Sequence, residues 1–135
     1  MQKKLINVPR NRPLTNYDIM KITKRLGLEE FRGVYMRNNL PKRPRLNESL
    51  IINLDNLAGE GTHWVAVRKF GNTAIYYDSY GDLQPPKEVI RYLNGVKIFY
   101  NYRRFQYSPV ECGYQAIRFL VLPDPFQLTL KTINT

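Results

Sequence analysis

Residues 63–81 have the sequence HWVAVRKFGNTAIYYDSYG, in which a glycine–asparagine pair separates two short apolar runs. Within 63–69 alternate residues form two sets of side chains, and this period of two residues is the one expected for the two faces of a β-strand. Gly71-Asn72 is a typical two-residue hairpin turn, and the second apolar run ends at Asp78. We therefore predict a β-hairpin here, and a fold organised around an antiparallel sheet.

Three further strands are predicted from short apolar runs outside the hairpin. One begins the segment 31–46 and gives way to a polar loop interrupted by prolines. Residues 49–55, SLIINLD, have the composition of a buried strand. Residues 96–107, VKIFYNYRRFQY, form the last predicted strand region.

Two helices are predicted from their end signals as well as from apolar spacing. The first follows a cap at Thr15 or Asn16 and ends at Gly27. The second is short, with Pro86 suited to its first position and Gly95 to its end. Both present an apolar stripe, as expected for helices that cover a sheet.

A third helix is predicted to begin at Cys112, the only cysteine of the chain, and to end at the Pro-Asp-Pro sequence of 123–125. The apolar face of this helix comprises Gly113, Ala116, Ile117, Leu120 and Val121. The order of elements is helix, strands, short helix, strand, helix. We therefore predict an α+β fold, a mainly antiparallel sheet packed against helices. It forms one domain over 1–135, with a basic arm at 1–13 and a short tail at 123–135.

The composition favours a folded protein of a reducing compartment. Hydrophobic residues make up 43% of the 135, and the lone cysteine excludes an internal disulfide. No apolar run approaches the roughly 18 residues of a membrane helix. The amino terminus carries charge but no apolar secretory region, so we expect a protein that is neither secreted nor bound in a membrane.

The net charge of +10 favours a polyanionic partner, and nucleic acid is the most common one. The alternative is a surface that is merely basic and soluble. Because no sequence-reading motif is present, binding would involve the nucleic-acid backbone and not the bases. The candidate nucleic-acid-binding residues are Lys42, Arg43, Arg45, Arg103 and Arg104.

Four residues have the chemistry that a cysteine nucleophile requires. Cys112 at a helix start lies where unpaired backbone N–H groups favour the thiolate. His63, the only histidine, begins one hairpin strand, and Asp78 ends the other, so the two are expected to lie close together. Gln106 precedes Cys112 by six positions and can supply a donor to an oxyanion. Each also has an ordinary structural explanation: core packing for Cys112, a structural or merely exposed side chain for His63, a turn for Asp78 and a strand end for Gln106.

These segments together resemble the adenain family, the adenovirus-type cysteine proteases, and more distantly the SUMO-deconjugating proteases of the same clan. The resemblance lies in GTHWVAV, YYDSYG and QYSPVECGYQAIRFL, in that order, and covers roughly 15–122. The upstream FRGVYMRNNLP and SLIINLD are also similar to adenain-like proteins of viruses and virus-derived mobile elements. The chain is shorter than typical adenains.

The resemblance implies a role for each residue of its motifs. Cys112 would be the nucleophile, His63 the general base and acid, Asp78 the residue that orients His63, and Gln106 the oxyanion donor. The candidate substrate-binding residues are Trp64, Gly113 and Gly61.

The same family implies the cofactors. No metal or cofactor is required for the chemistry, whereas DNA and an activating peptide are expected to stimulate it. The peptide would bind without a disulfide, because no second cysteine exists.

We therefore expect a cysteine endopeptidase that cleaves capsid or other precursor proteins after small, glycine-containing sequences. Its expected location is the virion and the host nucleus or cytoplasm, as a monomer. One alternative is a ubiquitin- or SUMO-type deconjugating isopeptidase. The other is a catalytically idle, basic structural protein that binds nucleic acid.

Overall fold

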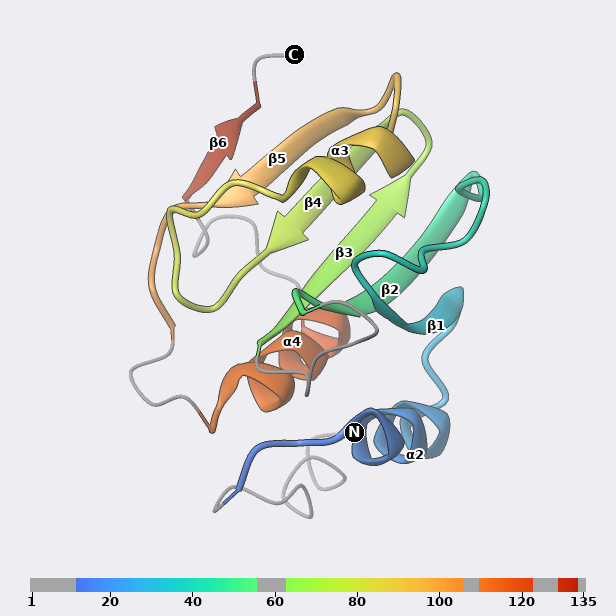
Figure 1. Cartoon of the computed structure of the whole chain (residues 1–135), viewed down its shortest axis with the longest axis vertical. Helices are drawn as coiled ribbons and strands as arrows, with labels where there is room; N and C mark the ends of the chain where they lie inside the picture. The colour runs from blue at the N-terminus through green and yellow to red at the C-terminus, as the bar shows by residue number, and fades with distance from the viewer. Residues whose placement is uncertain (1–11, 56–62, 106–109, 123–128, 134–135) are drawn as a thin grey trace.

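The computed structural model describes residues 12–55, 63–105, 110–122 and 129–133. Within these residues, three helices accompany one six-stranded sheet (Figure 1). The helices are α2 (Asn16–Leu26), α3 (Lys87–Tyr92) and α4 (Cys112–Val121). The strands are β1 (Phe31–Met36), β2 (Asn47–Asn53), β3 (Trp64–Phe70), β4 (Thr73–Tyr77), β5 (Lys97–Asn101) and β6 (Leu130–Thr132).

The sheet is mostly antiparallel, as predicted, and its strands lie in chain order from β1 to β6. β2 pairs with β3, β3 with β4, and β5 with β6 in antiparallel fashion. β1 pairs with β2, and β4 with β5, in parallel. Parallel neighbours need a crossover, which the proline-containing loop provides in the first case and α3 in the second. The sequence analysis did not anticipate these two parallel pairs.

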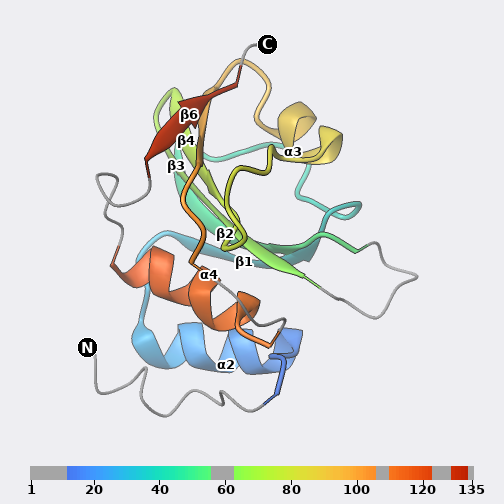
Figure 2. The ribbon, with the colours of Figure 1, turned by 90° about the vertical axis from the view of Figure 1, so that its left-hand side faces the viewer.

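Helices cover both faces of the sheet (Figure 2). α2 and α4 pack on one face, in a core that includes Trp64 and Ala66. α3 packs on the other face, in a second core that includes Val65 and Val67. Alternate side chains of β3 therefore belong to two separate apolar cores, and each core is covered by its own helices.

The predicted hairpin is present, and it lies at the centre of the sheet. Phe70 pairs with Thr73, so Gly71 and Asn72 form its two-residue turn. Gly71 has a φ of 60°, the left-handed conformation that this type of turn requires. The register of β3 and β4 then places the residues before Trp64 and after Tyr77 at the same end of the sheet.

The helix ends follow local chemistry. Thr15 caps α2, and its side chain and that of Asp18 form a reciprocal capping box. Gly27 ends α2 with a φ of 62°. Pro86, expected at the first position of the second helix, is instead its N-cap, since α3 begins at Lys87.

The predicted C-terminal tail contains a short strand that the sequence did not indicate. β6 pairs with β5 through Asn101 and Leu130, Tyr100 and Lys131, and Phe99 and Thr132. The observed strand is shorter than the region predicted at 96–107, because β5 ends at Asn101. Three residues are too few to show the alternation from which a strand is predicted. The conformation of β6 is set by its pairing with the open edge of β5.

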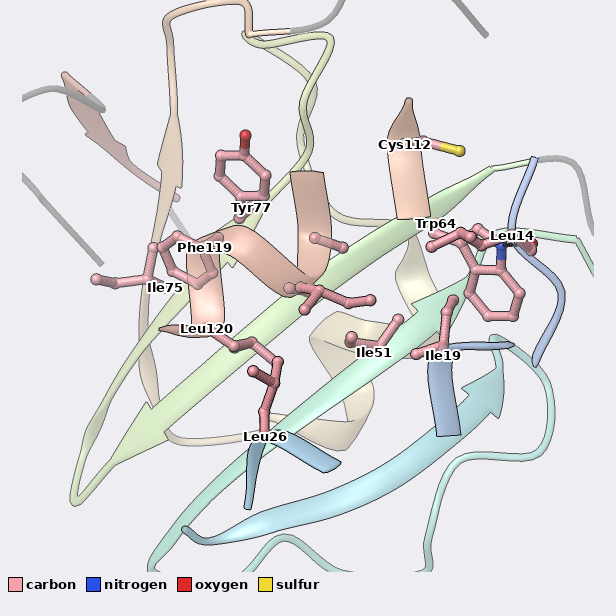
Figure 3. Close-up of a cluster of buried hydrophobic side chains, with 13 residues drawn as sticks. Leu14, Ile19, Leu26, Ile51, Trp64, Ile75, Tyr77, Cys112, Phe119 and Leu120 are labelled. Atoms are coloured by element: carbon pink, nitrogen blue, oxygen red, sulfur yellow. Dashed lines mark hydrogen bonds between the residues drawn. The ribbon is translucent and has the colours of Figure 1, made fainter. Parts of the chain in front are cut away.

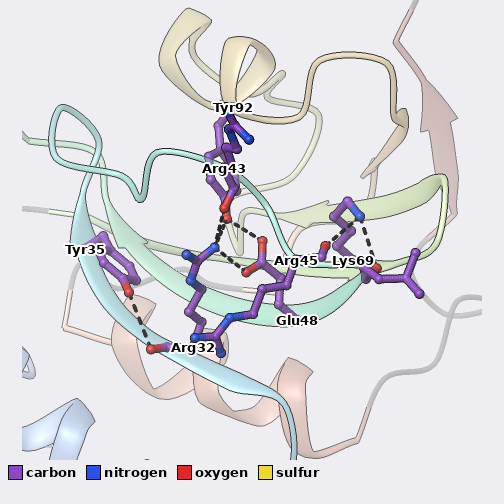
Figure 4. Close-up of polar contacts among 8 residues, drawn as sticks. Arg32, Tyr35, Arg43, Arg45, Glu48, Lys69 and Tyr92 are labelled. Atoms are coloured by element: carbon purple, nitrogen blue, oxygen red, sulfur yellow. Dashed lines mark hydrogen bonds and ion pairs between the residues drawn. The ribbon is translucent and has the colours of Figure 1, made fainter.

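A buried polar cluster fixes the loop between β1 and β2 (Figure 4). Arg32 pairs with the buried Glu48 at 3.0 Å, and Nη1 of Arg32 also donates to the carbonyl oxygen of Arg43 at 2.6 Å. Tyr92 of α3 accepts from Arg32 at 2.9 Å and donates to Glu48. Because each charge has a partner, this cluster anchors the loop to the sheet and to α3.

Candidate active site

His63 and Asp78 meet at the open end of the hairpin formed by β3 and β4. Nε2 of His63 lies 2.8 Å from Oδ1 of Asp78. The side chains of His63 and Asp78 are 15% and 1% exposed, respectively. The structure therefore brings the two together as the hairpin register predicted, with the carboxylate at the Nε2 edge of the imidazole ring.

Cys112 is the first residue of α4 and its side chain is buried. Figure 3 shows it at the end of this helix, beside the core residues Trp64 and Leu14. Here the N–H groups of the first helical turn, at the positive end of the helix dipole, favour negative charge on sulfur. Cys112 also interacts with His63, since its side chain raises the pKa of the imidazole ring. The structure thus joins Cys112, His63 and Asp78 in one contiguous group.

The pKa of His63 is raised to about 9 by its two partners. Burial is the largest influence and lowers this pKa, but the hydrogen bonds to Asp78 and Cys112 and their charges outweigh it. The imidazole ring is therefore protonated at neutral pH. Because Nε2 is bonded to Asp78, Nδ1 is the nitrogen that remains for Cys112.

Tyr80 covers the imidazole ring, a contact that the sequence analysis missed. The rings of Tyr80 and His63 are stacked, with centroids 4.8 Å apart and planes 28° apart. The Tyr80 main-chain N–H donates to Oδ1 of Asp78 at 3.0 Å. Arg104 lies over the Tyr80 ring at 5.2 Å. The short spacing between Asp78 and Tyr80 in DSYG was the available signal, but the stacking itself depends on the fold.

Trp64 and Gly113, both candidate substrate-binding residues, lie within the core under the site. Trp64 is 4% exposed, and its Nε1 donates to the carbonyl oxygen of Leu14 at 2.9 Å. A Cβ at Gly113 would lie 3.0 Å from Cβ of Leu14 and 3.2 Å from Cδ1 of Trp64. Packing against these two side chains therefore accounts for the glycine. Two other candidates, Gly61 and Gln106, lie outside the described residues.

The candidate nucleic-acid-binding residues form two separate clusters. Lys42, Arg43 and Arg45 are exposed on the loop between β1 and β2. Arg103 and Arg104 are exposed on the segment after β5. Since strands run in order from β1 to β6, these clusters lie toward opposite edges of the sheet (Figure 1).

The described ranges hold no group of three or more histidine, cysteine, aspartate or glutamate side chains arranged to bind a metal ion. Nor does any helix in those ranges have the length and apolar character needed to cross a membrane.

Comparison with known proteins finds no protein-family model that matches this chain and no curated protein with significant sequence similarity to it.

Proposed function

We propose that this chain is a cysteine endopeptidase of viral or virus-derived mobile-element origin, which cleaves capsid or other precursor proteins after small, glycine-containing sequences. The observation that carries the proposal is the contact of one histidine with both a carboxylate and a cysteine at a helix start. The resemblance of the three motifs to adenain-like proteases supports the same reaction.

The residues have distinct roles in the proposed reaction. The Cys112 thiolate attacks the carbonyl carbon of the scissile peptide bond, forming a C–S bond and an oxyanion. When the C–N bond breaks, protonated His63 gives its proton to the leaving amine, which leaves a thioester. Neutral His63 then takes a proton from water as the water attacks, and the acid product and the Cys112 thiolate are released. Asp78 holds the ring in place throughout, and Gln106 is assigned to the oxyanion.

Proton transfer by His63 also explains why the carboxylate is buried. A buried, hydrogen-bonded Asp78 holds the ring in one orientation and stabilises its positive charge. An exposed carboxylate would have weaker electrostatic influence, because water screens its charge. The arrangement therefore suits a histidine that must carry a proton between two steps.

The partners follow from the same proposal. We expect a protein substrate, non-specific contact with nucleic acid through exposed basic side chains, and stimulation by DNA or an activating peptide. The expected location is the virion and the host nucleus or cytoplasm, and the expected state is monomeric.

Cleavage assays distinguish this proposal from its alternatives. The protein is mixed with capsid-type peptides that contain Gly-Gly, and separately with SUMO and ubiquitin conjugates, each with and without DNA. Cut peptides support the endopeptidase, whereas cleavage of conjugates alone supports the isopeptidase. Cys112→Ser, checked for folding by circular dichroism, is the matched control and should cut nothing. A wild-type protein that binds DNA but cuts no substrate supports the idle structural protein.

A further inference from the structure

Asn101 is a buried polar residue at the end of β5, next to Asp78 at the end of β4. It is 1% exposed, although nothing in its sequence surroundings suggested a role. Oδ1 of Asn101 accepts a hydrogen bond from the Asp78 main-chain N–H at 2.8 Å. Nδ2 of Asn101 donates to the Asp78 carbonyl oxygen at 2.7 Å. One carboxamide thus satisfies both main-chain groups of Asp78.

We propose that Asn101 is the positioning residue of this site: it fixes the main chain of Asp78 so that the carboxylate meets His63. The inference rests on the proposed function, because it assigns a role within the Cys112, His63 and Asp78 group. Asn101 acts through Asp78 and makes no contact with the sulfur or the imidazole in this assignment.

The sheet shows why a carboxamide is needed at this position. The paired residues of β4 and β5 end at Tyr76 and Tyr100, so the ladder itself does not reach Asp78. Buried main-chain groups without partners are costly, and the carboxamide of Asn101 supplies both the acceptor and the donor that a ladder partner would provide. The second Nδ2 proton of Asn101 donates to the Arg103 carbonyl oxygen at 3.0 Å, which fixes the orientation of the carboxamide.

The turn that follows Asp78 is attached to the same segment of main chain. The Asp82 N–H donates to the Asn101 carbonyl oxygen at 2.9 Å, and the Phe105 N–H donates to the Ser79 carbonyl oxygen at 2.7 Å. Consequently the main chain of 78–82 is held at both ends against 101–105.

Gly81 makes this approach possible. A Cβ at Gly81 would lie 2.6 Å from the carbonyl carbon and oxygen of Arg103 and from the carbonyl oxygen of Tyr102. Its φ of 79° also belongs to the left-handed region that favours glycine. Gly81 therefore provides a second point at which the same contact can be perturbed.

The carboxylate depends on this support because its own contacts are few. Oδ1 of Asp78 meets His63 and the Tyr80 N–H. Oδ2 is buried and has no hydrogen-bond partner among the residues that the structure describes. The orientation of the carboxylate is therefore set by one oxygen and by the main chain that Asn101 holds.

The test uses the single histidine of the chain as its probe. The groups that act on His63 are Asp78 and Cys112, with Tyr80 stacked on its ring and Arg104 over Tyr80. We expect Asn101→Ala and Asn101→Ser to lower the pKa of His63 by about 1 unit in an NMR titration, because the carboxylate is no longer held against the ring. Asp78→Asn removes the charge of the carboxylate altogether, so its decrease in the His63 pKa is the maximum with which the other variants are compared.

A matched control separates positioning from general loss of stability. Tyr92→Phe removes a buried hydrogen bond to Glu48 from the other face of the sheet and should leave the pKa of His63 unchanged. Gly81→Ala perturbs the turn where it meets the main chain of Tyr102 and Arg103, and should lower the pKa as the Asn101 variants do. Folding of every variant is checked by circular dichroism.

The outcomes are distinguishable. If the Asn101 and Gly81 variants fold and titrate like the wild type while Asp78→Asn shifts His63, the inference about Asn101 is overturned and the proposed function stands. If Asp78→Asn also has no effect, the proposed function fails.

One measurement needs no substitution at all. In the wild-type protein the side-chain amide protons of Asn101 should exchange with solvent far more slowly than those of the exposed Asn94. Equal exchange rates would overturn the inference even where the variants do not fold.

Discussion

Asp78→Asn tests the electrostatic basis of the site most directly. This substitution keeps the shape of the side chain but removes the charge that His63 Nε2 contacts at 2.8 Å. The pKa of His63 is about 9 in the intact site, compared with 6.5 for a free histidine. The bond to Asp78 is the strongest of the influences that raise it, and burial opposes them. We therefore expect the variant's pKa to fall by at least about 2 units.

The measurement is an NMR titration of the only imidazole in the protein, so its signals need no assignment to one of several histidines. Cys112→Ser should also lower the pKa of His63, but by less than Asp78→Asn, because the Cys112 contact raises it less than the Asp78 contact does. The matched control is Asp82→Asn on the same turn. Asp82 is 50% exposed and pairs with Lys131 at 2.8 Å, so this variant changes net charge equally without touching His63. A wild-type pKa near 6.5, or equal shifts in the two aspartate variants, would refute the reasoning.

Four further outcomes are expected. Iodoacetamide should label Cys112 faster than a free thiol at pH 6–7, and His63→Ala should slow the labelling; equal rates in the two proteins would exclude an activated thiolate. The folded state holds a proton on His63 that the unfolded chain releases above pH 6.5, so this stabilisation is complete below 6.5 and is lost as the pH rises through about 9. Urea unfolding across that range should show the loss in the wild type, and a much smaller loss in His63→Ala. Gly113→Ala should cost about 1–3 kcal/mol of unfolding free energy, since its Cβ would crowd Leu14; unchanged stability with slower cleavage would instead assign the glycine to substrate access. Affinity for DNA should fall steeply with salt concentration, and a salt-independent affinity would contradict backbone binding.

The parts of the structure that sequence predicted are those with local causes. The hairpin depends on Gly71-Asn72 and on the alternation around it, so the proximity of His63 and Asp78 followed from residues within one short stretch. The start of α4 at Cys112 followed in the same way from the apolar spacing after it. These local patterns gave the general α+β architecture and the outline of the candidate site.

The parts that sequence did not predict depend on distant pairing. β6 is ordered by the edge of β5, and Asn101 acquires its partners only because β4 and β5 lie side by side in parallel. Tyr80 likewise contacts His63 only after the hairpin closes. No short window contains both members of these contacts, so neither periodicity nor turn chemistry can reveal them.

The position of β6 has a consequence for a chain that is still being synthesised. Leu130 pairs with Asn101, and the Thr129 carbonyl oxygen accepts from the Tyr102 N–H at 2.9 Å, so β6 closes the edge of the strand that supports Asp78. A nascent chain that has emerged only through α4 already contains Cys112 and His63 but lacks this edge. Ribosome-bound intermediates of that length should therefore hold Cys112 in an incompletely ordered site, and the full reactivity expected of its thiol should appear only after Ile133 has left the ribosome.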